Sequence, residues 1–261
     1  MIDFEMAKKA FNIFLNDDYN TSDCKIELKL EHTFEVVKCT ELITKSLNLT
    51  EEQTQIANII ALLHDIGRFD QVRKFGTFED YRTLDHAKYG DTILFDNNLI
   101  RSFIKEDKYD KIIRQSILNH NKYEIDKNLT TDELLYAKII RDADKMDNFR
   151  VKSTHDLYSI ANIDKKEIES SYISENVFNS FMNCQTILSN ERITSMDIWV
   201  SFIAFIFDLN FAASFEYIVN KDYINKLIDR IEYKNMETKL KMEQIREMSI
   251  KYISDRLGEK R

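Results

Sequence analysis

The scarcity of helix-breaking residues constrains this chain more than any other feature of its sequence. Its 261 residues contain no proline and only four glycines. Proline and glycine are the residues that most strongly interrupt helices, so little here stops a helix once it has begun. Hydrophobic residues at 43% and charged residues at 31% are typical of a globular chain and not of a disordered one. The sequence therefore predicts an all-α fold.

Apolar residues recur at helical spacing in several separate segments. The segment that ends at His64 begins with a capping box, with Thr50 at the N-cap and Gln53 three positions later. We expect Gly67 to end this helix, and residues 69–84, which show no sustained period, to form a loop or lid beside a site. Further helices are expected over residues 3–16, 26–48, 85–96, 108–122 and 132–151, the last with Thr131 as its N-cap.

A histidine and a carboxylate stand side by side at the end of an aliphatic run. The run is Ile59–Leu63, and it leads directly into His64 and Asp65. An unpaired charge at the buried end of an apolar helix is costly, which makes a bound cation the favoured interpretation. The alternatives are a buried ion pair and a histidine that interacts with the dipole at the helix C-terminus.

Three more histidines and one aspartate fall on or beside other predicted helices. A lone histidine in such a position usually has ordinary hydrogen-bond partners, so each taken alone is weak evidence for a metal site. Asp144 is stronger, because it lies among the apolar residues Ile140, Ala143 and Met146. His155 fits no part of the pattern. The candidate ligands in chain order are His32, His64, Asp65, His86, His120 and Asp144.

The order of these residues resembles the HD superfamily of metal-dependent phosphohydrolases, in its two-metal form, over about residues 26 to 150. The local pieces that carry the resemblance are His32–Val36, His64–Arg68, Asp85–Lys88 and Asp142–Lys145. The resemblance implies an HD-type helical bundle. It also implies that His32, His64, Asp65 and Asp144 hold one ion and that Asp65 bridges to a second ion held by His86 and His120.

The chemistry expected from this resemblance is hydrolysis by metal-bound hydroxide. Imidazole and carboxylate ligands in a mixed set favour Mn, Fe, Co, Ni or Zn over Ca. The substrate class would be a phosphomonoester or phosphodiester of a small molecule, commonly a nucleotide. A phosphate also needs cationic donors, and Arg68 and Lys145 are predicted to bind substrate and to act in catalysis with Asp65. The alternative for both is a solvated surface charge.

The residues around the histidines depart from several better-defined branches of the superfamily. No Gly-Tyr-Pro motif can occur without proline, and Asn121 follows His120 where the cyclic-dinucleotide branch has a second histidine. Thr33, Phe34 and Glu35 do not match the His-x-x-Arg start of deoxynucleotide triphosphohydrolases. Two alternatives therefore stay open: a non-catalytic regulatory module that binds metal or a phosphorylated ligand, and a single-metal enzyme in which His86 and His120 act as general acid and phosphate donor.

Composition and the second half of the chain predict its organisation and setting. We expect a catalytic core over residues 1–160 and a helical extension over 161–261 packed on the same domain, since no Pro/Gly/Ser linker separates them. The apolar run 198–207 is too short to span a bilayer and predicts a buried helix or a subunit interface, with a homodimer through the 195–257 helices. The net charge of −8 argues against extended nucleic acid. Three scattered cysteines and no apolar signal segment predict a cytoplasmic protein with no membrane partner.

Overall fold

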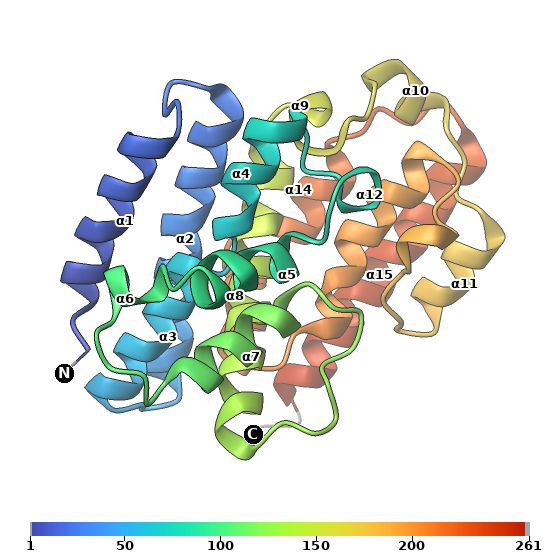
Figure 1. Ribbon diagram of the computed structural model, residues 1–261. Helices are drawn as coiled ribbons and strands as arrows, with labels where there is room; N and C mark the ends of the chain where they lie inside the picture. Colours follow the sequence, from blue (N-terminus) through green and yellow to red (C-terminus); the bar gives the residue numbers. More distant parts are fainter. Residues whose placement is uncertain (1, 259–261) are drawn as a thin grey trace. The chain divides into compact units, whose positions relative to one another are not determined.

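The computed structural model describes residues 2–258 and is built from helices joined by turns (Figure 1). No strand occurs in these residues, so the predicted all-α fold is confirmed. The chain divides into two compact units, Met1–Asp144 and Lys145–Arg261, here called unit 1 and unit 2. The predicted packing of residues 161–261 on the catalytic core stays a prediction.

Unit 1 contains the helices that carry every predicted metal ligand. Helix α2 packs along α3, α4 packs against α5, and α5 in turn contacts α7, while α1 lies against α3 and α6. Helix α8 begins in unit 1 and continues into unit 2. The elements are α1 (Phe4–Asp18), α2 (Cys24–Ser46), α3 (Glu51–Leu63), α4 (Ile66–Phe75), η1 (Asp80–Arg82), α5 (His86–Asp91), the π-helical turn η2 (Thr92–Asp96), α6 (Ile100–Phe103), α7 (Asp110–His120) and α8 (Thr131–Thr154).

Helix α3 is buried along its whole C-terminal half. It begins with the predicted capping box, in which Thr50 Oγ1 accepts from the amide of Gln53 at 3.3 Å and Gln53 Oε1 accepts from the amide of Thr50 at 2.9 Å. Every residue from Ile56 to Leu63 is buried. Apolar residues on all sides let the helix pack against α1, α2 and α7 at once. Its C-terminal end therefore delivers His64 and Asp65 into the interior.

The expected loop after Gly67 is wrong in its first half. The helix breaks at His64 and Asp65, and α4 resumes at Ile66 and runs to Phe75. Gly67 lies in the first turn of α4, where an added Cβ would stand 2.3 Å from the carbonyl oxygen of His86. This glycine thus permits α4 to approach α5 closely and does not end a helix. The chain turns instead at Gly76, whose φ of 66° is the left-handed conformation that favours glycine.

Helix α8 also begins one residue earlier than predicted. Its capping box pairs Thr130 with Glu133: the Thr130 amide donates to Glu133 Oε2 at 2.8 Å, and the Glu133 amide donates to Thr130 Oγ1 at 3.3 Å. Thr131 was the predicted N-cap, but it is the first residue of the helix itself. Two adjacent threonines offer the same hydroxyl, and the position of Glu133 decides between them.

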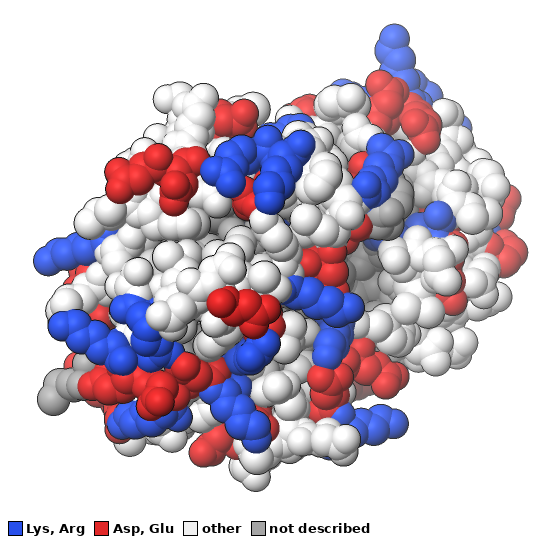
Figure 2. Space-filling model, viewed as in Figure 1, with Lys and Arg blue, Asp and Glu red and all other residues white. Residues whose placement is uncertain are grey.

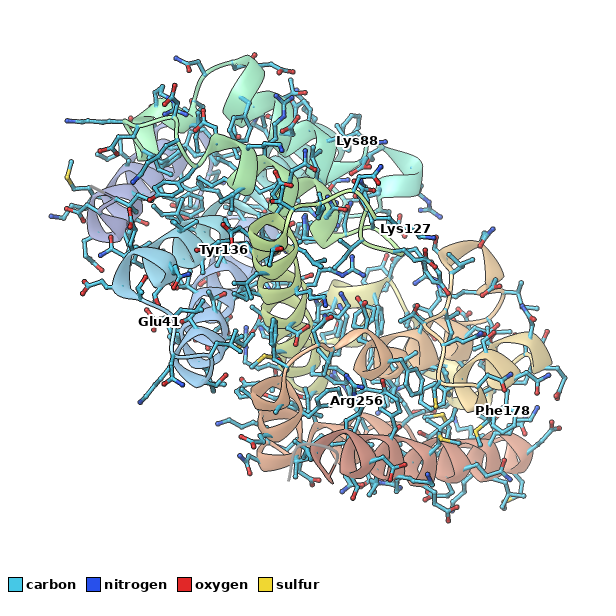
Figure 3. All side chains as sticks on the ribbon, turned by 90° about the horizontal axis from the view of Figure 1, so that it is seen from below. Glu41, Lys88, Lys127, Tyr136, Phe178 and Arg256 are labelled. Atoms are coloured by element: carbon cyan, nitrogen blue, oxygen red, sulfur yellow. The ribbon has the colours of Figure 1, made fainter. Side chains whose placement is uncertain are left out.

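Unit 2 has a hydrophobic core of its own around Trp199. The predicted buried helix over 198–207 is confirmed as α12 and η4, and Trp199 Nε1 donates to the Leu227 carbonyl at 3.1 Å. Figure 3 shows α15 along this unit, with Phe178 beside its N-terminal part and Arg256 near its C-terminal end. The elements are α9 (Leu157–Ala161), α10 (Lys165–Ser170), α11 (Glu175–Met182), η3 (Ser189–Glu191), α12 (Ser195–Ile203), η4 (Ala204–Asp208), α13 (Ala212–Asn220), α14 (Tyr223–Asp229) and α15 (Met236–Gly258).

The surface carries charges of both signs. Figure 2 shows acidic and basic side chains interspersed over the visible face, without a continuous basic area. Among residues 2–258, no helix is both long and apolar enough to cross a bilayer. Several apolar side chains of α15 are exposed, among them Met236, Leu240 and Ile250. The predicted homodimer through residues 195–257 stays a prediction.

Candidate metal centre

The structure brings the six predicted ligands of unit 1 together from separate helices. Five of them are buried, and Asp144 is partly exposed. His120 is the last residue of α7 and His86 the first of α5, so two helix ends converge on the same place. The positions are His32 in α2, His64 and Asp65 between α3 and α4, His86 in α5, His120 in α7 and Asp144 in α8.

Asp65 stands at the middle of this cluster, with a pair of histidines on each carboxylate oxygen. Its Oδ2 lies 3.2 Å from His64 Nε2 and 3.6 Å from His32 Nε2. Its Oδ1 lies 3.2 Å from His86 Nε2 and 3.5 Å from His120 Nε2. The carboxylate therefore faces two different histidine pairs with its two oxygens.

Asp144 completes the side of the cluster that faces Asp65 Oδ2. Its Oδ1 lies 3.1 Å from His32 Nε2 and 3.9 Å from His64 Nε2. On the other side, the Nε2 atoms of His86 and His120 are 3.0 Å apart. Two compact sets of possible ligand atoms result, His32 with His64 and Asp144, and His64 with Asp65 and His120. Both clusters could hold a metal ion.

The hydrogen bonds of the histidine rings are those expected of metal ligands. The Nδ1 atoms of His64 and His120 each lie 2.7 Å from a backbone carbonyl oxygen three residues earlier, that of Ala61 and that of Ile117. His86 Nδ1 lies 2.6 Å from a carboxylate oxygen of Asp80. A carbonyl or carboxylate can only accept, so the network assigns the hydrogen to Nδ1 in all three rings. The lone pair of each Nε2 then points into the centre, as metal-binding histidines require.

Two atoms of the centre meet no hydrogen-bond partner of good geometry among residues 2–258. They are His64 Nε2 and Asp65 Oδ1, and both are buried. Buried polar atoms without hydrogen bonds are costly in a folded protein. A cation that takes their lone pairs would remove this cost, so the residues present fit a metal ion.

The electrostatics of the centre favour the protonation states of metal ligands. Burial lowers the pKa of His64 below its ordinary value, and burial together with the Arg68 charge lowers the pKa of His86 to about 4. Burial opposes ionisation of Asp65, but the Lys29 ammonium and the His64 ring outweigh it and hold the pKa of Asp65 well below its usual range. His64 and His86 are thus neutral and Asp65 is ionised at neutral pH, which metal binding requires.

Lys29 is a member of this site that sequence reasoning missed. Its ammonium contacts Asp65 Oδ2, and its side chain is only 14% exposed. The residue lies on α2 three positions before His32, so both side chains project from the same face of the helix. A basic residue at this spacing before a predicted ligand histidine is the signal that could have found it.

The two predicted phosphate-binding residues lie in different surroundings. Arg68 Nε is 3.8 Å from Asp65 Oδ1, so this guanidinium stands at the edge of the centre. Lys145 follows Asp144 on α8, and its Nζ lies 2.7 Å from Asp208 Oδ2. Both side chains are largely buried, so neither is the solvated surface charge that was the alternative.

A buried arginine secures the end of α7. The Arg141 guanidinium donates to the backbone carbonyl of Asn119 at 2.8 Å and to that of Lys122 at 2.6 Å. These carbonyls flank His120 and lack helical partners at the C-terminus of the helix. Arg141 therefore fixes the chain on both sides of a candidate ligand.

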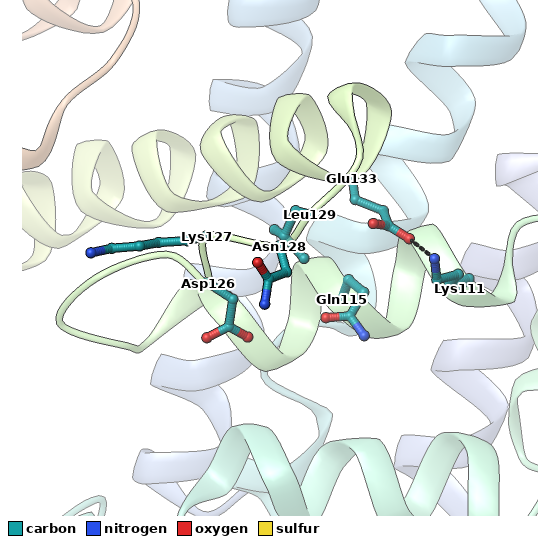
Figure 4. Close-up of a pocket in the computed structure, with 7 residues that line it drawn as sticks. All are labelled: Lys111, Gln115, Asp126, Lys127, Asn128, Leu129 and Glu133. Atoms are coloured by element: carbon teal, nitrogen blue, oxygen red, sulfur yellow. Dashed lines mark ion pairs between the residues drawn. The ribbon is translucent and has the colours of Figure 1, made fainter.

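The site does not coincide with a surface pocket found in unit 1. Figure 4 shows this pocket, with a volume of about 340 Å³ beside the N-terminal part of α8. Lys111 Nζ and Glu133 Oε1 form an ion pair of 2.9 Å at one end of it (Figure 4). Its lining residues are Lys111, Gln115, Asp126, Lys127, Asn128, Leu129 and Glu133, and they include no predicted ligand.

The helical fold of unit 1 and its buried histidine–aspartate centre define a class of α-helical domain able to hold a divalent cation. Residues 30–148 match the family model of the HD domain. This part of the chain is an HD domain, and the predicted resemblance is confirmed. No curated protein and no solved structure matches the chain.

Proposed function

We propose that this protein is a metal-dependent hydrolase of small phosphorylated molecules, which cleaves a phosphomonoester or a phosphodiester. A nucleotide is the first substrate class to test. The observation that carries the proposal is the position of Asp65, whose two oxygens face different histidine pairs within 3.6 Å. One carboxylate that serves two sets of ligands is the arrangement a two-metal centre needs.

The proposed ligand sets divide at Asp65. His32, His64 and Asp144 would hold one ion together with Asp65, and His86 and His120 would hold a second ion. Mn, Fe, Co, Ni and Zn suit these ligands, since imidazole and carboxylate together favour transition metals. When bound, such ions lower the pKa of a coordinated water and neutralise charge on phosphoryl oxygens.

Arg68 is the side chain that we propose to bind the substrate phosphate. Its Nη1 donates to Gln71 Oε1 at 2.7 Å, to the Phe78 carbonyl at 2.6 Å and to Asp80 Oδ1 at 2.5 Å. These three acceptors fix the plane of the guanidinium. No described residue accepts a hydrogen bond from Nη2, which leaves a pre-oriented cationic donor for a phosphate oxygen.

We propose Lys145 as a second side chain that donates a hydrogen bond to the substrate phosphate. Its ammonium is only about a tenth exposed and forms the ion pair with Asp208 described above. Arg68 is paired with Asp80 as well, but its Nη2 stays available, whereas a phosphate at Lys145 would have to share a single ammonium nitrogen with Asp208. The contribution of Lys145 to substrate binding is therefore expected to be smaller than that of Arg68.

The first experiment measures metal content per chain in protein purified without chelator. We expect about two ions in the wild type and few in Asp65→Ala, because both ligand sets lose their shared carboxylate. Asp126→Ala is the matched control, since Asp126 is an exposed residue of unit 1 that pairs with Lys122. A screen of nucleotides and other phosphoesters with Mn²⁺ and Fe²⁺ then follows for all three proteins.

Two outcomes would contradict parts of the proposal. One ion or none in reconstituted wild-type protein would reject the two-metal arrangement. Two bound ions with no hydrolysis of any phosphoester would instead favour a regulatory module that binds a phosphorylated ligand. Calorimetric binding of the same phosphoesters to the metal-loaded protein would then identify that ligand.

A further inference from the structure

Asp80 lies outside the predicted ligand set, yet its carboxylate joins two groups of the centre. Its Oδ2 lies 2.6 Å from His86 Nδ1, and its Oδ1 accepts from Arg68 Nη1 at 2.5 Å. Gln71 Nε2 donates to the same Oδ1 at 3.0 Å. The Asp80 side chain, in the segment 76–85, thus touches both the candidate metal ligand His86 and Arg68, which we propose to bind the substrate phosphate.

We propose that Asp80 is a positioning residue that holds the Nε2 lone pair of His86 toward Asp65 and, with the same carboxylate, fixes the Arg68 guanidinium. The inference rests on the proposed function, because it assigns Asp80 to the half of the metal centre formed by His86 and His120. Asp80 itself makes no contact with the converging Nε2 atoms. It acts through His86 and Arg68.

The position of His86 in its helix explains why this histidine needs such a partner. His64 and His120 stand at the C-terminal ends of helices, where the carbonyl three residues earlier is held by the helix and accepts from Nδ1. His86 is the first residue of α5 and has no helical turn before it. Residue Thr83, three positions earlier, lies in a turn with φ −132° and ψ −88°. The acceptor for His86 must therefore come from a side chain.

A carboxylate does more for the ring than a carbonyl does. Charge-assisted hydrogen bonds are shorter and stronger than neutral ones. A carboxylate on Nδ1 also increases the electron density at Nε2 and so strengthens the metal–nitrogen bond. His86 would consequently be the strongest histidine ligand on the Oδ1 side of Asp65.

The segment that carries Asp80 is anchored to α4, so the carboxylate is well placed. Gln71 is fully buried and donates to Thr83 Oγ1 at 2.7 Å, and Arg68 donates to the Phe78 carbonyl at 2.6 Å. Thr83 Oγ1 in turn donates to the Glu79 carbonyl at 2.9 Å. These bonds hold the turn η1 on both sides of Asp80.

A different role for Asp80 is less consistent with the contacts. Asp80, Asp85 and His86 offer ligand atoms close enough together to surround a cation. However, Asp85 is the N-cap of α5: its Oδ1 accepts from the amides of Ala87 at 3.1 Å and Lys88 at 3.3 Å. It also accepts from Asn121 Nδ2 at 3.0 Å. With Asp85 committed to these bonds, the contacts favour positioning by Asp80 over a third metal site.

The first test determines which ring nitrogen of His86 carries the hydrogen. We would record nitrogen-15 spectra of the histidine side chains in chelated protein at pH 7, with His86→Gln to assign the signal. In the wild type we expect the hydrogen on Nδ1. In Asp80→Asn the side-chain amide can donate to Nδ1 as well as accept from it, so part of the population should carry the hydrogen on Nε2. An unchanged His86 signal in Asp80→Asn would overturn the proposal.

The second test measures metal affinity by calorimetric titration with Mn²⁺. We expect Asp80→Asn to weaken one of the two ions by about 10- to 100-fold, the usual effect of losing an outer hydrogen bond to a ligand. His86→Gln should weaken the same ion more strongly. Asp85→Asn is the matched control, because asparagine also serves as an N-cap and leaves the contact between Asp80 and His86 in place. Equal affinities in wild type and Asp80→Asn would contradict the proposal.

Two safeguards keep the inference separate from folding and from the proposed function. Circular dichroism checks that each variant folds. If Asp80→Asn is unstable, Asp80→Glu and Asp80→Ala replace it, and Asp80→Glu, which keeps the carboxylate, should bind Mn²⁺ more tightly than Asp80→Ala. If Asp80→Glu binds metal no better than Asp80→Ala, the proposal fails. If the wild type binds no metal at all, the proposed function fails, and the nitrogen spectra of the chelated protein still decide the role of Asp80.

Discussion

The Lys29 ammonium contacts Asp65 Oδ2, the same oxygen that faces His64. A lysine of the chain therefore compensates the charge of the carboxylate that we propose as the bridge between two ions. In chelated protein, Lys29 is the strongest of the groups that keep Asp65 ionised, because burial alone would raise its pKa.

Removal of Lys29 should make the protein more dependent on metal. We expect Lys29→Met to lower the free energy of unfolding of chelated protein by about 3 kcal/mol, because a buried carboxylate loses its partner. Added Mn²⁺ should restore more stability than it adds to the wild type, since the cation then supplies the missing charge. Thermal unfolding with and without Mn²⁺ measures both effects. Lys38→Met, at an exposed position of α2, is the control, and equal metal responses in all three proteins would refute the expectation.

The stability of chelated protein should fall as the pH decreases from 6.5 toward 4. The pKa of His86 is lowered from 6.5 to about 4, so the unfolded chain binds a proton in this range that the folded chain refuses. The contribution of His86 is complete above pH 6.5 and disappears as the pH approaches 4, with a total of about 3 kcal/mol. His64 acts in the same direction, since burial lowers its pKa too. Urea unfolding at pH 7 and pH 4.5 should show a smaller difference for His86→Gln than for the wild type; the same difference would argue against a neutral, buried His86.

The packing of α4 on α5 should tolerate no side chain at Gly67. The Cβ of Gly67→Ala would meet the His86 carbonyl oxygen at 2.3 Å, so the two helices would have to separate. We expect a loss of about 1–3 kcal/mol in unfolding free energy, as for other overpacked sites, together with weaker binding of the ion assigned to His86. Gly76→Ala is the control, because it costs backbone strain at φ 66° but meets no atom within 4 Å. Chemical denaturation and Mn²⁺ titration of both variants check this, and full metal affinity in Gly67→Ala would contradict it.

Arg68→Ala should impair hydrolysis more than it impairs metal binding. We expect kcat/KM to decrease by about 10- to 100-fold, because a fixed cationic donor to the phosphate is lost. Gln71→Ala is a matched control: Gln71 also bonds Asp80 and the turn that follows it, but its amide is no charged donor. The two variants should thus loosen the 76–85 segment alike and differ in kcat/KM. Similar kcat/KM values for both would assign Arg68 to the segment and not to the substrate.

Much of the helical architecture is encoded locally and could be predicted from the sequence alone. Each signal that predicted helices is local. The chain lacks proline, Thr50 and Gln53 of the capping box are three residues apart, and the aliphatic run leads directly into His64. The same locality explains the mistakes. Gly67 resembles a helix terminator until α5 is seen beside it, and the choice between Thr130 and Thr131 depends on where Glu133 reaches.

The arrangement of the centre was decided by tertiary structure. The order of histidines and aspartates pointed to the HD domain and supplied the six candidate ligands, whose metal-binding role stays a prediction. Only the packing of α2, α3, α5, α7 and α8 places their atoms around Asp65. Lys29 and Asp80 also belong to the site only through tertiary packing. Lys29 contacts Asp65 after the end of α3, and Asp80 contacts His86 at the start of α5. Helical periodicity is set by neighbours three or four residues apart, whereas these contacts join residues of separate elements, whose packing no local pattern specifies.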